Sequence, residues 1–178
     1  TLTDDNTVES IDETGGVAIN DFFNEVAFHG DVVDPGAGGD TKKAVFTSEG
    51  LIAKEGDTLA DGTTIVDDID ETGGVAINIF GDVAFHGDVV DPGAGTDTVR
   101  AVFTQDGLVA KEGDILPDGT ILEEISEPGG VAINFSGDVA FHGRTGGVKA
   151  VFTQNGLIAK EGDLLSDGTT LGEIHNSG

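Results

Sequence analysis

The sequence predicts an all-β protein made of three tandem repeats of antiparallel strands, each repeat about 57 residues long. Similar stretches open at Gly15, Gly73 and Gly129, so successive copies are offset by 58 and 56 residues. Short segments rich in Val, Ile, Phe and Thr alternate with glycine-containing turns, as is typical of strands joined by tight connections. No segment has helical periodicity, and the 29 glycines of the chain disfavour helices further.

The repeats divide the chain into a partial repeat, which carries the last strand of a preceding copy, and three full copies. The predicted boundaries are 1–14, 15–72, 73–128 and 129–178. The third copy is shorter in one place, since six residues separate Gly143 from Ala150 whereas thirteen separate Gly87 from Ala101. A surface loop tolerates such a deletion most easily, so this segment is predicted to be a loop.

Each copy is expected to contain five short strands. In the second copy they are 73–78, 82–87, 100–105, 108–113 and 120–125. Asp106-Gly107 joins the third and fourth of these strands, and Asn155-Gly156 stands at the same place in the third copy. These dipeptides accept the positive φ angles of a type I′ turn, so they predict hairpins. Neighbouring strands are therefore expected to be antiparallel.

The two faces of each predicted strand differ in size. Val83 and Phe85 point to one face of 82–87, while Ala84 and His86 point to the other. One face is thus bulky, the other is small, and neither carries much charge. Such sheets are usually covered on both sides, so we expect similar sheets to stack face against face.

The recurring Ile-Asn and Val-Ala-Phe elements carry a family resemblance. They occur at Ile19-Asn20, Ile77-Asn78 and Ile133-Asn134, and at 26–28, 83–85 and 139–141. With the Gly-Asp between them in the later copies, they resemble the HAF-type and related INxxGxVAF repeats of large secreted bacterial proteins. The resemblance implies propeller-blade-like sheets and an extracellular or cell-surface location.

Three copies leave the arrangement of the sheets open. Closed propellers typically need about four to eight blades, so an open stack is expected, with a closed threefold β-trefoil-like barrel as the alternative. The last strand type occurs four times and the others three times, at 7–11, 64–69, 120–125 and 170–174. A closed ring leaves one of the four surplus, whereas an open stack can use all of them. We therefore predict head-to-tail association through the terminal strands.

The charge balance limits the possible partners. Eight Lys and Arg against 34 Asp and Glu give a net charge of −26. This charge repels phosphates and so disfavours nucleic acid, whereas it attracts cations such as Ca²⁺. Solubility in a salty medium is the alternative reason for the acidity. The chain has no cysteine, and no apolar run approaches the ~20 residues that a membrane span needs.

Two groups of recurring aspartates are candidate calcium ligands. The first group flanks a glycine-containing turn and comprises Asp57 with Asp61, Asp114 with Asp118, and Asp163 with Asp167. The second lies in the predicted long loop and comprises Asp31, Asp34 and Asp40 in copy one, and Asp88, Asp91 and Asp97 in copy two. Their oxygens suit Ca²⁺. The alternatives are ordinary Asp-Gly turns and a solvated acidic loop.

Histidines and Lys-Glu pairs also recur once in each copy. His29, His86 and His142 suggest either a shared zinc site or three histidines on the small faces. The Lys-Glu pairs suggest either an ion-pair ladder between sheets or exposed strand ends. They are Lys54-Glu55, Lys111-Glu112 and Lys160-Glu161.

The polar features predict binding or building rather than catalysis. No nucleophile–base motif and no phosphate-cradling glycine loop is present, and the polar features occur in threes, whereas an active site is usually one asymmetric constellation. We expect a non-enzymatic structural protein of an extracellular filament, matrix or adhesive layer, stabilised by Ca²⁺ and self-associating. The main alternative is a multivalent glycan-binding module, and a fragment of a propeller enzyme is a third.

Overall fold

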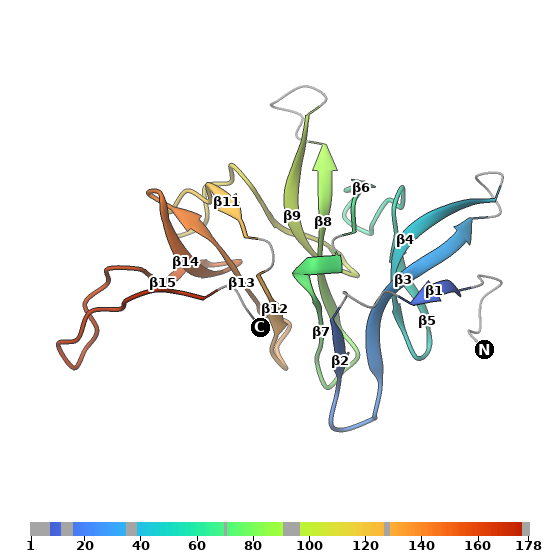
Figure 1. The fold of residues 1–178 in the computed structure, drawn as a ribbon, viewed down its shortest axis with the longest axis horizontal. Helices are drawn as coiled ribbons and strands as arrows, with labels where there is room; N and C mark the ends of the chain where they lie inside the picture. Colours follow the sequence, from blue (N-terminus) through green and yellow to red (C-terminus); the bar gives the residue numbers. More distant parts are fainter. Residues whose placement is uncertain are drawn as a thin grey trace.

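The computed structural model describes residues 8–11, 16–34, 39–69, 71–90, 97–126 and 129–175. Over these residues the protein is all-β, as predicted, with three similar five-stranded antiparallel sheets and one short 3-10 turn, η2 (Glu71–Gly73) (Figure 1). None of the sheets closes into a barrel, so the threefold barrel considered above is wrong. In the described part of the chain no helix is long and apolar enough to cross a membrane.

The three sheets use equivalent strands. The first contains β1 (Val8–Ile11), β2 (Val17–Ile19), β3 (Val26–Asp34), β4 (Asp40–Thr47) and β5 (Gly50–Lys54). The second contains β6 (Ile65–Asp67), β7 (Val75–Ile77), β8 (Val83–Val90), β9 (Thr98–Thr104) and β10 (Gly107–Lys111). The third contains β11 (Glu124–Ile125), β12 (Val131–Ile133), β13 (Val139–Thr145), β14 (Val148–Thr153) and β15 (Gly156–Lys160).

Each sheet has five strands but is only four strands wide, because two short strands pair with different parts of the same side of one long strand. In the first sheet β1 pairs with residues 30–32 of β3 and β2 pairs with residues 26–28 of the same strand. β4 then pairs with the other side of β3, and β5 forms the far edge. The other two sheets repeat this order, which resembles the four-stranded blade of a propeller.

Strand donation links each sheet to the preceding sequence repeat. β1, β6 and β11, called here the leading strands, precede the other strands of their sheets along the chain. β6 belongs to the copy predicted at 15–72 but pairs with β8 of the second sheet, and β11 pairs with β13 of the third. The fourth segment of this type, 170–174, joins none of the three sheets in the described part of the chain. The sheets are therefore offset by one strand from the sequence repeats.

The predicted face-to-face stacking holds at both junctions between sheets. Between the first and second sheets, the small residues Ala27, Val45 and Ala53 form one buried cluster with Phe85 and Phe103. The next junction repeats this contact, since Ala84, Val102 and Ala110 cluster with the bulky residues Val139, Phe141 and Phe152. Each sheet thus offers its small face to the bulky face of its successor.

Cross-strand phenylalanine pairs fill the bulky faces. Phe85 stacks on Phe103 with ring centroids 5.6 Å apart, and Phe141 stacks on Phe152 at 5.8 Å. Phe28 and Phe46 form the same pair in the first sheet at 5.4 Å. Phe28 is only partly buried, whereas its counterparts Phe85 and Phe141 are fully buried. The outer face of the first sheet is therefore less well covered.

The hairpins at Asp106-Gly107 and Asn155-Gly156 form, but not as type I′ turns. Asp106 and Asn155 do not have positive φ angles, and each glycine is the first residue of the next strand. The two-residue connections are instead Gln105–Asp106 and Gln154–Asn155. The glycines serve a contact between sheets, described below.

Replacing Phe103 by alanine should destabilise the protein by about 3–5 kcal/mol, the usual cost of emptying a buried phenylalanine site. Phe103 has no exposed surface and lies at the junction of the first two sheets. Urea unfolding measures the effect. Phe135→Ala is the matched control, because Phe135 is exposed and its loss should change stability by no more than about 0.5 kcal/mol. Equal losses in the two variants would contradict the packing described here.

Candidate functional site

The loops that leave each sheet contain the first group of predicted calcium ligands. These connecting loops span residues 55–64, 112–123 and 161–170. Asp57, Asp114 and Asp163 each accept a hydrogen bond from the backbone N–H of the lysine three residues earlier, at 3.0, 2.9 and 2.8 Å. Lys54 and Lys111 also place their Nζ atoms 2.7 and 3.4 Å from these carboxylates. The first aspartate therefore clamps the start of its own loop.

The second aspartate of the first two loops bonds to the next sheet. Asp61 Oδ1 accepts from the N–H of Thr63 at 2.8 Å, while its Oδ2 accepts from the N–H of Leu108 at 2.8 Å. Asp118 repeats this arrangement with Thr120 and with Leu157, both at 2.8 Å. The backbone donors, those of the local threonines first, lower the pKa of both aspartates. One carboxylate thus ties a turn to a strand of the following sheet.

Gly107 and Gly156 make these inter-sheet bonds possible. A Cβ atom at Gly107 would collide with the carboxylate of Asp61, and one at Gly156 would collide with that of Asp118. The Asp-Gly and Asn-Gly dipeptides read from the sequence as hairpin signals are therefore also docking points for the preceding loop. Nothing local in the sequence distinguishes the two roles.

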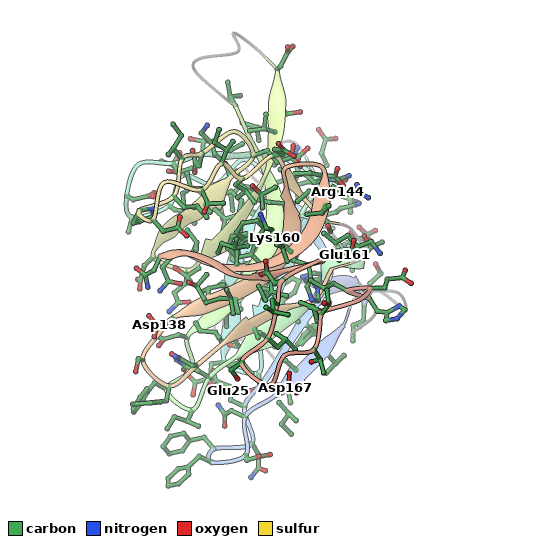
Figure 2. All side chains as sticks on the ribbon, turned by 90° about the vertical axis from the view of Figure 1, so that its left-hand side faces the viewer. Glu25, Asp138, Arg144, Lys160, Glu161 and Asp167 are labelled. Carbon is green, nitrogen blue, oxygen red and sulfur yellow. The ribbon has the colours of Figure 1, made fainter. Side chains whose placement is uncertain are left out.

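Asp167 has only the local part of this arrangement among the contacts described. It accepts from the N–H and the hydroxyl of Thr169 at 2.9 and 2.6 Å, and these bonds lower its pKa. Its loop extends beyond the third sheet (Figure 1), and Figure 2 looks onto this end of the molecule, with Asp167, Lys160 and Glu161 labelled.

The predicted acidic loop is largely strand. Asp31, Asp34 and Asp40 lie in β3 and β4, and Asp88 lies in β8. Asp31 faces Lys43 across the sheet and accepts from the Ser10 hydroxyl at 2.6 Å. Asp88 faces Arg100, whereas Asp40 and Asp97 are exposed. Asp91 and the side chain of Asp34 lie outside the described residues.

No described group of three or more His, Asp or Glu side chains is arranged to hold a metal ion. The paired aspartates of each connecting loop direct their oxygens to different backbone donors rather than to one point. Calcium binding by these residues stays a prediction. The turn alternative accounts for the bonds that the structure contains.

The histidines belong to three different sheets, on strands β3, β8 and β13. His29 and His86 are buried, and His86 Nδ1 lies 3.0 Å from the carbonyl oxygen of Gly73. Burial lowers the pKa of His142, and the charge of Lys149 adds to this effect. This placement agrees with histidines on the small faces.

The Lys-Glu pairs clamp chain segments. Lys54 and Lys111 form the ion pairs with Asp57 and Asp114 given above. Glu112 Oε1 accepts from the N–H of Ile125 at 2.9 Å, and Glu161 Oε1 accepts from the N–H of Ile174 at 2.9 Å. In this way Glu112 and Glu161 hold the segments that follow their connecting loops. The repeated Lys-Glu spacing was a signal for this role, although the sequence did not reveal the partner.

The two ends of the stack expose opposite halves of the junction. In the first sheet Val17 is 67% exposed, whereas its counterpart in the second sheet, Val75, is 8% exposed. At the other end Leu165 is 41% exposed, whereas Leu116, which packs against the third sheet, is 5% exposed. Ile19 and Ile158 are also exposed at these two ends. Among the described residues, the bulky face at one end is therefore only partly covered, although Phe46 is buried, and the small face at the other end is more exposed than its counterparts are.

Four exposed phenylalanines were not predicted as functional residues from the sequence. Phe22, Phe23, Phe80 and Phe135 are exposed in the turns that follow β2, β7 and β12. Asparagine side chains shape these turns, since Asn20, Asn78 and Asn134 each accept a backbone N–H at 2.8 Å. The available signal was the recurrence of phenylalanine after the Ile-Asn element.

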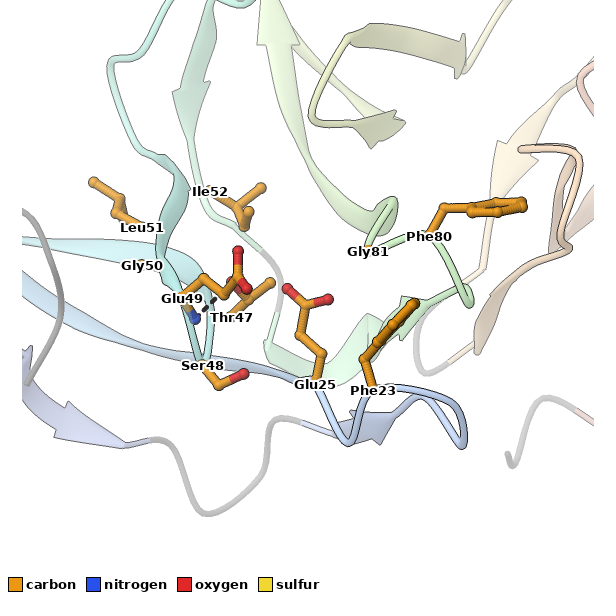
Figure 3. Close-up of a pocket in the computed structure, with 10 residues that line it drawn as sticks. All are labelled: Phe23, Glu25, Thr47, Ser48, Glu49, Gly50, Leu51, Ile52, Phe80 and Gly81. Atoms are coloured by element: carbon orange, nitrogen blue, oxygen red, sulfur yellow. Dashed lines mark hydrogen bonds between the residues drawn. The ribbon is translucent and has the colours of Figure 1, made fainter.

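A pocket of ≈ 750 Å³ lies beside two of these phenylalanines. The rings of Phe23 and Phe80 stand at one side, and the carboxylates of Glu25 and Glu49 point toward the middle (Figure 3). Gly50 and Leu51 line the other side. These last two residues are the first-sheet counterparts of Gly107 and Leu108, which receive the loop of Asp61.

Comparison with known proteins gives a family and no activity. The family described as "Family of unknown function (DUF7453)" matches residues 19–173. Neither the curated proteins nor the solved structures contain a match to the chain. The resemblance to HAF-type repeats stays a prediction.

Replacing Asp118 by asparagine should lower the melting temperature more than replacing Asp167 by asparagine. Of these two aspartates, Asp118 has a described bond to a second sheet and Asp167 has none. Both pKa values are lowered in the fold, so each carboxylate stabilises the protein above about pH 4 and loses this effect as the pH falls through its folded pKa. The difference between Asp118→Asn and Asp167→Asn should therefore shrink on acidification. Thermal melts between pH 7 and pH 3 measure it, and equal melting temperatures at pH 7 would contradict the role of the Leu157 bond.

Proposed function

The chain belongs to a protein family of unknown function, DUF7453, and we propose that it is a structural β-repeat protein of an extracellular filament, matrix or adhesive layer. In this proposal copies of the chain associate head to tail, so that stacking continues from one molecule to the next. The resemblance to repeats of secreted proteins supports the location, and the geometry of the two ends supports the association.

The uncovered end faces carry this proposal. The first sheet presents a bulky face with Val17 and Ile19 exposed, and the third presents a small face with Ile158 and Leu165 exposed. Faces of these two kinds bury one another at both junctions inside the chain. The third sheet of a second copy therefore offers the bulky face of the first sheet a small face, like those that already cover the bulky faces of the second and third sheets.

The symmetry of such a contact favours long assemblies. The two surfaces are different, so the contact is heterologous, and a heterologous contact that does not close a ring extends into a filament. No barrel closes within the part of the chain that the structure describes. An architecture of this kind serves mechanical and adhesive roles without requiring a catalytic group.

Calcium enters the proposal through charge. A net charge of −26 on 178 residues opposes the approach of two copies, and a bound divalent cation would reduce this repulsion. The exposed Asp40 and Asp97 lie near the ends of long hairpins, where cations have access.

Association should increase with protein concentration, and replacing Val17 and Ile19 together by serine should weaken it by at least about tenfold. One buried apolar side chain contributes about 1.5–3 kcal/mol, and about 1.4 kcal/mol is a factor of ten in affinity. Sedimentation velocity over a concentration series, in Ca²⁺ and in chelator, measures both effects.

Phe135→Ser is the matched control for this experiment, since Phe135 is equally exposed but lies in a turn outside the end faces. A wild-type chain that stays monomeric at every concentration would overturn the proposal. Identical association in Ca²⁺ and in chelator would remove calcium from it.

A glycan-binding module is the second candidate, and the pocket beside Phe23 and Phe80 favours it. Aromatic faces pack against sugar rings, and the carboxylates of Glu25 and Glu49 can accept hydrogen bonds from sugar hydroxyls. Equivalent turns with Phe80 and Phe135 recur along the stack, which suits weak binding strengthened by multivalency.

Replacing Phe23 and Phe80 together by alanine should abolish glycan binding if the pocket is a sugar site, because both aromatic walls are lost. A glycan array probed with wild type and with this variant tests the idea, and Ile115→Ala, at an exposed position of a connecting loop, serves as the control. Absence of binding by the wild type would remove this candidate and leave the structural one.

A further inference from the structure

We propose that copies of this chain join by strand exchange: the C-terminal segment 161–174 of one copy replaces β1 on strand β3 of the next copy. The inference rests on the proposed self-association and states how it occurs. Its partner is a second copy of the chain, and its acceptor is the side of β3 at residues 30–32.

Both internal junctions follow one rule, in which the preceding sheet donates the leading strand. β6 follows the loop that leaves the first sheet and pairs with β8, and β11 follows the next loop and pairs with β13. The donated loop is fastened as well, by Asp61 to Leu108 and by Asp118 to Leu157. Stacking of two sheets and donation of a strand therefore occur together.

The C-terminal segment already has the conformation of a donor. Gly162 N–H donates to the carbonyl of Leu171 at 2.9 Å, as Gly113 N–H does to Leu122 at 2.8 Å. Leu164 pairs with Thr170 in an isolated antiparallel bridge, and Ile115 pairs with Ile121 in the equivalent bridge of the preceding loop. The bond from Ile174 N–H to Glu161 copies the bond from Ile125 N–H to Glu112 at the same length of 2.9 Å.

This segment differs from the earlier donors in one respect, because it has no acceptor strand. Ile125 pairs with Gly143, whereas in the described residues no strand pairs with 173–174. Asp167 likewise has its local bonds to Thr169 but no described bond to a further sheet. Within the described residues the donor segment is therefore formed, with Lys149 of its own sheet bonded to the Ile174 carbonyl at 3.1 Å, but it pairs with no acceptor strand.

β1 is the poorest fit among the leading strands. Ile11 is 63% exposed, whereas Ile69 and Ile125, at the same position in the other sheets, are 0% exposed. Ile174 of the unused donor is 9% exposed even without an acceptor. The occupant of the first sheet thus buries less apolar surface than its counterparts do.

The sequence before β1 shows the same mismatch. Residues 1–11 read TLTDDNTVESI and align with LLSDGTTLGEI at 164–174. At the position of Asp5 the other three copies have Gly62, Gly119 and Gly168, with φ of +87°, +86° and +85°. Such φ angles favour glycine over residues with a Cβ. The C-terminal segment is therefore better suited to this turn than the N-terminal one.

The acceptor strand suits the incoming segment. In the register of β11, Ile174 would face Gly30 and Glu173 would face Asp31. Gly30 is needed there, because a Cβ atom would collide with the carbonyl of the paired strand, as at Gly143. The second sheet has the same row of two acids and a base, since Asp67, Asp88 and Arg100 are aligned as Glu173, Asp31 and Lys43 would be.

Exchange is needed because β1 occupies the place that a donor requires. A second copy stacked on the first sheet as the internal sheets stack would bring its segment 170–174 to β3, where β1 lies. Displacement of β1 frees it, and the next copy repeats the event, so the assembly grows without closing. The added strand is held by main-chain hydrogen bonds, as in other cases of strand addition.

A disulfide that locks β1 in place tests the proposal. Ser10 and Asp31 are paired across β1 and β3, and the chain has no cysteine of its own. The variant S10C/D31C should therefore form one intramolecular disulfide. Sedimentation velocity should show a monomer when this variant is oxidised and wild-type association when it is reduced.

The matched control is V90C/T98C, the equivalent cross-strand pair of β8 and β9 in the second sheet, where β1 does not pair. Its disulfide staples the same type of hairpin, so this variant should associate like wild type in both redox states. Association of oxidised S10C/D31C at the level of this control would overturn strand exchange but leave face-to-face self-association intact. Wild type that stays monomeric would overturn the proposed function and the exchange with it.

A second measurement detects the exchanged pair directly. Copies carrying E173C are mixed with copies carrying D31C under mild oxidation, and a covalent heterodimer is expected on a non-reducing gel. Copies carrying T41C replace D31C as the control, because Thr41 lies on β4 and is not opposite the incoming strand. Wild-type association together with equal crosslinking to both partners would contradict the proposed register.

Discussion

The contact between a small apolar face and a bulky apolar face is the interaction on which this structure depends. Each sheet has both faces because side chains alternate along its strands, so every sheet can pack on a predecessor and on a successor. Phe85 and Phe103 fill the first junction, and Phe141 and Phe152 fill the second. A sheet of four short strands has no other core, since both of its faces are already used. Stability therefore belongs to the junctions, and a single repeat has little of its own.

Carboxylate side chains also stabilise these junctions. In the first two connecting loops the second aspartate accepts a hydrogen bond from a backbone N–H of the next sheet, and Glu112 and Glu161 hold the segments that follow their loops. Charge-assisted bonds of this type are stronger than neutral ones. Many carboxylates of this very acidic chain are thus occupied as acceptors of backbone hydrogens. These carboxylates recur because each copy repeats the same connecting loop, and two of the three loops lie at a junction inside the chain.

The same logic makes the ends of the stack the most informative part of the molecule. A junction needs a small face, a bulky face, a donated strand and a fastening loop, and the two ends together present one set of these parts. The turns with exposed phenylalanines add a second surface that repeats along one edge, and the pocket beside Phe23 and Phe80 reaches Gly50 and Leu51, the counterparts of the residues that receive a connecting loop. The proposed self-association and the proposed sugar binding would therefore share this part of the first sheet.

The amino-acid sequence by itself determined the strands, their antiparallel pairing and the division of each sheet into a small and a bulky face. These features are local, because alternation along Val83–His86 is set by the two-residue period of a strand and the copies are read by comparison along the chain. Only the tertiary structure decided which sheet receives each leading strand and which atoms the aspartates bind. Asp61 reaches Leu108, 47 residues away, and Gly107 admits it although the dipeptide also suits a simple hairpin. An Asp-Gly dipeptide occurs in simple turns, in metal-binding loops and in docking contacts alike, so the dipeptide does not reveal its role. The approach of two sheets in space determines which of these roles it has.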